Sequence, residues 1–224
     1  MALCSRQSGK STVCCYTAVW TAIHRPKSLI LIVAPAQRQA IEDQKRCYEI
    51  LERAGIGEKT MKEYNQTQCK LRNGSRIISL PGNETSTRGY SAPDIILVDE
   101  ANLVPDPIFQ SLLPSTATNK KARWLLVSTP LLTSGFFYDN WFSGNSQFER
   151  FEVPASECPR ISAEHLEQAR MTMSPIAYSS EYECIWGLDA ASMWSRDLVN
   201  SAISDTIHPL FPRVSVGDFL LQGG

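Results

Sequence analysis

The sequence predicts an α/β fold in which helices flank a mainly parallel sheet. Three short apolar runs, at 29–33, 95–98 and 123–127, have the composition of strands buried on both faces. Helical stretches alternate with these runs, as the connections between parallel strands require. A chain of 224 residues with 43% hydrophobic content can bury one such core and carry some appended structure.

The helices are predicted from polar and apolar spacing and from their end signals. A helix over 12–23 ends before Arg25-Pro26, and a helix over 37–53 stops near two glycines. Near the end of the chain, helices are expected over 162–171 and 174–184, because Ser162 suits an N-cap and Ser174-Pro175 suits a helix start. These helices supply the layers on the sheet.

Two further strands are predicted around a tight turn. Residues 68–71 and 76–80 flank Asn73-Gly74, a pair that favours a two-stranded hairpin. A polar loop over 81–90 follows, and a last short strand is expected at 148–153.

Residues 4–12, Cys-Ser-Arg-Gln-Ser-Gly-Lys-Ser-Thr, indicate a phosphate-binding loop that leads into a helix. Gly9 allows backbone N–H groups to approach a β-phosphate, Lys10 places a cation on the β and γ oxygens, and Ser11 offers a hydroxyl to Mg²⁺. The usual pattern begins with glycine, where this chain has Cys4. The residues expected to hold ATP are Ser5, Arg6, Gln7, Ser8, Gly9, Lys10, Ser11 and Thr12.

A pair of carboxylates, Asp99-Glu100, directly follows the apolar run 95–98. Open parallel sheets bind their ligands at the carboxyl ends of the strands, where this pair is expected. We interpret Asp99 as a second Mg²⁺ ligand and Glu100 as the residue that activates the attacking water. Taken alone, the pair also fits a buried strand followed by an exposed acidic turn. The two motifs together, about 90 residues apart and in the right order, predict an ATP site.

Composition narrows the possible partners and the compartment. The formal net charge is −1, so any contact with nucleic acid must come from a local patch, and Lys120, Lys121 and Arg123 form the densest basic cluster. No apolar run is long enough to span a bilayer. The seven cysteines include no C-x-x-C pair, which favours reduced thiols in a cytoplasmic protein without a zinc site. The three histidines have no partners at metal-ligand spacing.

The order of these motifs resembles the ATPase domain of tailed-phage terminase large subunits. The segments that carry the resemblance are Ser5–Ser11, Ala34–Gln39, Asn73–Arg76, Arg88-Gly89, Val98–Ala101 and Ser128–Pro130. Cys158–Ser162 and Ser180–Cys184 are similar to the linker segment that follows that domain. In that family a residue other than glycine at the first loop position is normal.

The resemblance implies a P-loop NTPase fold of the ASCE type and an ATP hydrolase that packages double-stranded DNA into a procapsid. It further implies a homo-oligomeric ring, a portal protein and a small terminase subunit as partners, and action in the host cytoplasm. By this resemblance Arg6 and Arg88 are candidates for the arginine finger, Arg6 for local phosphate contact and Arg88 for a contact in trans. Ser128 and Thr129 match the motif that couples hydrolysis to DNA movement. Residues 37–39 either track DNA or form a solvated helix start.

The resemblance also predicts a domain organisation: an ATPase domain over 1–155, a linker subdomain over 156–210, and over 211–224 a remnant of an RNase H-like nuclease. Only three residues precede the loop, so most of the family's first strand is expected to be missing. Asp218 alone stands where the nuclease's acidic cluster would begin, and one aspartate cannot hold two metals, so no nuclease activity is expected.

Two other functions stay open at this point. A helicase-like, DNA-dependent ATPase shares the same motifs, but it would need a second motor lobe, and fewer than 95 residues follow Pro130. The chain could instead be a truncated prophage remnant that does not turn over ATP.

Overall fold

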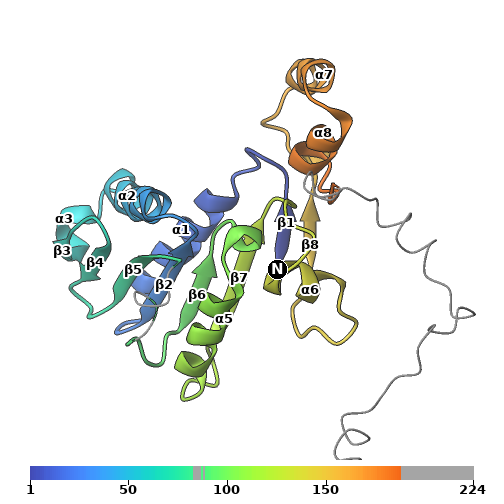
Figure 1. Ribbon diagram of the computed structural model, residues 1–224. Coiled ribbons are helices and arrows are strands. Elements are labelled where there is room, and N and C mark those ends of the chain that lie inside the picture. The colour runs from blue at the N-terminus through green and yellow to red at the C-terminus, as the bar shows by residue number, and fades with distance from the viewer. Residues whose placement is uncertain (83–86, 88, 188–224) are drawn as a thin grey trace, which may run out of the picture. The chain divides into compact units, whose positions relative to one another are not determined.

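The computed structural model describes residues 1–82, 87 and 89–187 (Figure 1). Arg88, the end of the expected linker subdomain and the expected nuclease remnant with Asp218 lie outside the described residues. The predicted domain boundaries therefore remain predictions.

The described residues form one mixed sheet of eight strands in the order β3-β4-β5-β2-β6-β7-β1-β8. The strands from β5 to β8 along this order are parallel, and β3 and β4 add an antiparallel edge. Their bounds are β1 Ala2–Cys4, β2 Leu29–Ala34, β3 Met61–Tyr64, β4 Gln68–Leu71, β5 Arg76–Pro81, β6 Ile95–Val98, β7 Arg123–Ser128 and β8 Phe151–Val153. Because β7 separates the phosphate-loop strand β1 from the acidic strand β6, the sheet is that of an ASCE P-loop NTPase, as predicted.

Helices cover both faces of this sheet, with α1 and α2 on one face and α5 and α6 on the other (Figure 1). Their bounds are α1 Lys10–His24, α2 Gln37–Arg53, α3 Gly57–Thr60, α5 Asp106–Leu112, α6 Phe136–Phe142, α7 Ala163–Thr172 and α8 Pro175–Tyr182. Short 3-10 helices occur at η1 Ala101–Leu103, η2 Leu113–Thr116 and η3 Ala155–Glu157.

Strand β2 shows why the sheet needs two helix layers. All six of its residues are buried, because side chains alternate between the faces. Leu31 and Val33 pack into the core under α5, with Ile108 and Phe109. Ile30 and Ile32 pack into the other core, under α1 and α2, with Val19. A run without alternation of polar residues is therefore the expected signature of this strand.

Most predicted elements are confirmed, with shifts at their ends. The helix α2 has the predicted bounds, and the hairpin of β4 and β5 forms around Asn73-Gly74. The Asn73 side chain also donates to the carbonyls of Ala22 and Ile23, so this turn completes the end of α1. The strand predicted at 148–153 is shorter, and it forms only over β8. The helix α8 ends at Tyr182, and Cys184 has a positive φ of 59° that a continuing helix cannot contain.

The three-residue strand β1 is enough to place the phosphate loop. It pairs in parallel with β7 on one side and with β8 on the other. Leu3 and Cys4 are both buried, so the short strand is held in the middle of the sheet. Within the described residues, no helix combines the length and apolar content that crossing a bilayer requires.

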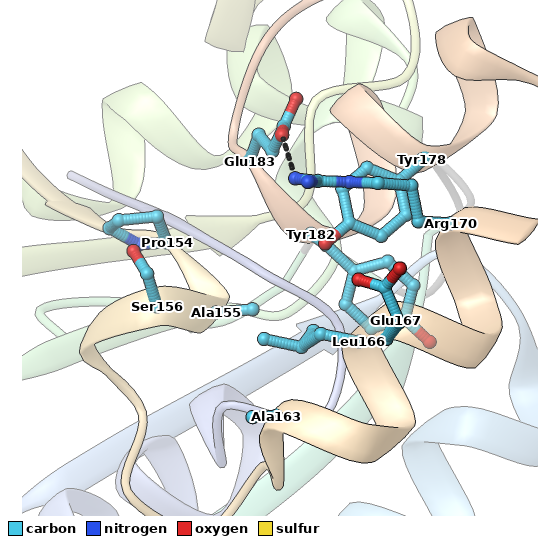
Figure 2. Close-up of a pocket in the computed structure, with 10 residues that line it drawn as sticks. All are labelled: Pro154, Ala155, Ser156, Ala163, Leu166, Glu167, Arg170, Tyr178, Tyr182 and Glu183. Atoms are coloured by element: carbon cyan, nitrogen blue, oxygen red, sulfur yellow. Dashed lines mark hydrogen bonds and ion pairs between the residues drawn. The ribbon is translucent and has the colours of Figure 1, made fainter.

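Helices α7 and α8 form a small pair beyond the end of β8, around a cavity of about 440 Å³ (Figure 2). Arg170 crosses from α7 toward α8, where its guanidinium lies 4.8 Å from the centre of the Tyr178 ring and 3.2 Å from a Glu183 oxygen. None of the lining residues belongs to the phosphate loop. This cavity therefore belongs to the packing of the helix pair and is separate from the nucleotide site.

Candidate nucleotide site

The phosphate loop turns sharply between β1 and α1, and the turn depends on Gly9 rather than on residue 4. Gly9 has φ 97°, which only glycine adopts at low cost, and Gln7 has φ 60°. Cys4 is the last residue of β1 and has no positive φ, so this position does not require the usual glycine. The helix α1 begins at Lys10, and its first N–H groups and dipole favour an anion in front of the loop.

Asp99 lies beside the start of α1, at the carboxyl end of β6. Its carboxylate is fully buried and accepts a hydrogen bond from the Ser11 hydroxyl. Gln39 Nε2 also donates to it at 3.3 Å, and the N–H of Glu100 donates at 3.0 Å. Burial raises the pKa of Asp99 above its ordinary value, while the hydrogen bond from Ser11 opposes this rise. The structure thus brings together the two residues predicted to share a metal ion.

Glu100 faces the phosphate-loop lysine. Lys10 Nζ lies 3.0 Å from Glu100 Oε1, and the two side chains are 9% and 21% exposed. Thr129 Oγ1 donates to the other oxygen of Glu100 at 3.4 Å. The backbone of Glu100 is left-handed, with φ 48°, which is uncommon for a residue other than glycine and often marks a functional position.

Asn102, which sequence reasoning missed, holds the loop after β7 against the loop after β6. Its Oδ1 accepts from the N–H groups of Leu131 and Leu132 at 2.7 and 2.6 Å, and its Nδ2 donates to the carbonyl of Leu132. Its own N–H donates to Ser128 Oγ at 3.1 Å. The predicted coupling residues Ser128 and Thr129 are therefore both bonded to the turn that carries Glu100.

The α7–α8 segment contacts the phosphate loop from outside the sheet. Arg6 N donates to the carbonyl of Glu181 at 2.7 Å, and its guanidinium pairs with the Glu181 carboxylate at 3.2 Å. The Arg6 side chain is 62% exposed, so the guanidinium lies on the rim of the site. Arg160, which the sequence did not single out, donates to the carbonyl of Gln7 at 3.4 Å and lies over Gly9.

The remaining predicted residues fall in different places. Ser5 is fully buried beneath the loop, with its hydroxyl 4.0 Å from the sulfur of Cys158. Gln37 and Arg38 are exposed, whereas Gln39 faces Asp99 and so belongs to the site. The cluster of Lys120, Lys121 and Arg123 lies at the opposite, amino end of β7, so it cannot reach the nucleotide site. The seven cysteines are all buried and free.

One sequence signal could have found Gln39. It stands just after β2, whose carboxyl end is next to that of β6 in the sheet. Arg160 and Asn102 carry no comparable signal, because their partners are set by how loops after different strands pack.

The strand order and the phosphate loop define the class as a P-loop NTPase of the ASCE type. A family model for terminase large subunits, T4likevirus-type, N-terminal part, matches residues 1–201, and the chain belongs to this family. A probable terminase large subunit from Enterobacteria phage P7 is 41% identical over 61 residues, which is 27% of this chain and 12% of that protein. The matched stretch is thus a small part of that relative's length.

Solved structures share the fold. The ATPase domain of the large terminase of Thermus phage P74-26 has a TM-score of 0.70 and 21% identity, over 83% of this chain and 87% of that one. The large terminase of another phage, a thermophilic bacteriophage, in complex with ADP has a TM-score of 0.68 and 12% identity, over 84% of this chain and 48% of that one.

Proposed function

We propose that this chain is the ATPase motor part of a phage DNA-packaging terminase, which hydrolyses ATP to move double-stranded DNA into a procapsid. The convergence of Lys10 and Ser11 from the phosphate loop with Asp99 and Glu100 from the end of β6 carries this proposal. The family membership supports it.

The residues present fit a magnesium ion. Ser11 and Asp99 offer a hydroxyl and a carboxylate that already touch each other, and hard oxygen donors are what Mg²⁺ prefers. Mg²⁺ in such sites bridges phosphate oxygens and neutralises charge that develops on them. Gln39 and the N–H of Glu100 keep the Asp99 carboxylate oriented toward the start of α1.

The chemical step needs a base and fixed cations. The oxygen of a water attacks the γ-phosphorus, its proton passes to Glu100, and the bond from the γ-phosphorus to the bridging oxygen breaks to give ADP and phosphate. Thr129 holds one carboxylate oxygen of Glu100, and Lys10 faces the other. Lys10 and the N–H groups at the start of α1 would bind the phosphates.

Product formation would be felt at two places. Thr129 and Ser128 join the Glu100 turn to β7, and Arg6 joins the phosphate loop to α8. Arg88 remains a candidate for an arginine finger supplied to a neighbouring subunit. We propose duplex DNA, a portal protein and a small terminase subunit as the partners of a homo-oligomeric ring that acts in the host cytoplasm.

The test is ATP turnover by the purified 224-residue chain, with and without linear duplex DNA. We expect Mg²⁺-dependent turnover that duplex DNA stimulates, and its loss in Glu100→Gln. Nucleotide binding without turnover by the unmodified chain would overturn the proposal in favour of an inactive remnant. Turnover stimulated by single-stranded DNA alone would favour a helicase-like ATPase instead.

A further inference from the structure

A second concave site lies at the opposite end of the sheet from the nucleotide. It is a cavity of about 690 Å³, lined by Arg25, Asp94, Asn119, Lys120, Lys121, Ala122 and Arg123, and is called the basic cavity below. The parallel strands β6 and β7 begin at this end, with Ile95 paired to Arg123. The nucleotide residues follow the other ends of the same strands.

The basic cavity has a surplus of positive charge. Arg25, Lys120, Lys121 and Arg123 are exposed, and in the part of the chain that the structure describes none of them forms an ion pair. Asp94 is the one acid in the lining, and its carboxylate already accepts a hydrogen bond from the N–H of Leu29 at 2.9 Å. For a chain with a formal net charge of −1, this is a local concentration of cations.

The backbone that carries these cations is fixed by hydrogen bonds. Asn119 Oδ1 accepts from the N–H of Lys121 at 3.1 Å, and its Nδ2 donates to the carbonyl of Pro93 at 3.0 Å. The N–H of Arg123 donates to the carbonyl of Asp94 at 3.0 Å. Arg25 closes the end of α1 through its N–H to the carbonyl of Thr21. Only the side chains therefore need to be ordered when an anion binds.

We propose that the basic cavity is a contact site for the phosphate backbone of duplex DNA. The inference rests on the proposed function, and it names the surface that would hold the DNA. Four cations from two separate segments suit a row of phosphates better than one small anion. The lining contains no aromatic ring on which an unpaired base could stack, which favours the backbone of a duplex.

The position of the cavity also gives it a route to the ATP site. Arg123 is the first residue of β7, and Ser128 is the last. The six-residue strand spans roughly 20 Å, and its far end bonds to the turn that carries Glu100. A DNA contact at one end of β7 thus acts on the same rigid strand as the catalytic turn.

The experiment compares two double variants with equal loss of charge. Lys120→Ala/Lys121→Ala removes half of the cations of the basic cavity, and Lys45→Ala/Lys62→Ala removes two exposed lysines elsewhere. Binding of a labelled linear duplex is measured by anisotropy between about 50 and 200 mM salt. For the first variant we expect affinity roughly 10- to 100-fold lower at about 0.1 M salt and a salt slope smaller by about 2. The second variant should stay close to the unmodified chain.

Basal ATP turnover, measured without DNA, separates this inference from the proposed function. If the cavity variant keeps basal turnover and binds duplex like the control variant, the basic cavity is not the contact site, while the motor function stands. Absence of both turnover and duplex binding in the unmodified chain would remove the proposed function and the inference with it. Displacement of the duplex by excess inorganic phosphate at constant ionic strength would assign the cavity to a free anion, and would also overturn the inference.

Discussion

The ammonium of Lys10 lies 3.0 Å from the carboxylate of Glu100, so the main phosphate-binding cation and the proposed base are ion-paired. The phosphates of a nucleotide need the same ammonium. Nucleotide binding must therefore share or break this pair, which releases Glu100 at the moment when a water has to be activated. The pair gives a structural reason for hydrolysis to wait for bound substrate.

Replacing Glu100 by Gln should separate binding from turnover. The amide keeps the shape of the side chain but cannot accept a proton, so we expect turnover to fall at least about 100-fold. It also removes the anion that competes for Lys10, so nucleotide binding should be equal or tighter. Turnover assays and titration with a fluorescent ATP analogue measure the two effects. Unchanged hydrolysis in this variant would show that Glu100 is not the base.

Replacing Lys10 by Ala should weaken binding and turnover together, because it removes the cation that faces the phosphates. Loss of a charge-assisted contact predicts roughly 10- to 100-fold weaker nucleotide binding. The matched control is Lys45→Ala, which removes an exposed lysine of α2 and should bind normally. Equal affinities for the two variants would contradict the role of Lys10.

Replacing Arg160 by Ala tests whether the α7–α8 segment supports the phosphate loop. Arg160 donates to the carbonyl of Gln7 and lies over Gly9, so its loss should weaken ATP binding roughly 3- to 10-fold. Arg170→Ala is the control, because its guanidinium contacts Tyr178 and Glu183 but not the loop (Figure 2). If both variants lose the same affinity in a nucleotide titration, packing of the helix pair is the cause, and Arg160 has no separate role.

Replacing Asn102 by Ala should destabilise the fold. Asn102 is 4% exposed, and its side chain bonds both N–H groups and one carbonyl of the loop after β7. Leaving these groups without partners should cost roughly 2–4 kcal/mol, or about 5–15 °C in the thermal midpoint. Asn102→Asp keeps the acceptor and should lose less.

The control for this comparison is Asn145→Ala, because Asn145 is exposed and its side chain makes no hydrogen bond in the described part of the chain. Its midpoint should stay within the effect of about 0.5 kcal/mol that surface substitutions usually have. A midpoint for Asn102→Ala that matches this control would show that the two loops do not depend on Asn102.

Asp43 should make stability depend on pH. Its carboxyl is 2% exposed and one of its oxygens has no hydrogen-bond partner among the described residues. Burial, with the charges of Asp99, Glu100 and Glu42, raises its pKa to about 8, and only Arg46 opposes the rise. The folded state therefore binds this proton more tightly than the unfolded state does. Between the ordinary carboxyl pKa and about 8, the free energy of unfolding should fall as pH rises.

Asp43→Asn removes this titration. We expect the variant to gain stability relative to the unmodified chain as pH increases, with a difference of at least about 1 kcal/mol above pH 8. Denaturant unfolding at about pH 5 and pH 8.5 measures the difference, and Glu42→Gln on the exposed side of α2 serves as the control. A difference that does not change with pH would mean that Asp43 is ionised throughout this range.

The sequence predicted local structure best where one segment carried its own signal. The helix α2 was predicted with its observed bounds, and Asn73-Gly74 located the hairpin. Short elements were missed, namely β3, α5 and α6, because segments of four to seven residues show little periodicity and form by packing against the sheet.

By itself, the sequence determined the parallel sheet, the phosphate loop and the acidic pair, because each depends on residues that are close along the chain. The tertiary structure decided which groups meet them. Gln39 reaches Asp99 because β2 is next to β6, and Arg160 reaches the phosphate loop because the segment after β8 folds back over it. Such contacts join residues 60 to 153 positions apart, and they are fixed by the order of strands and the packing of loops. Local pattern carries no information on either.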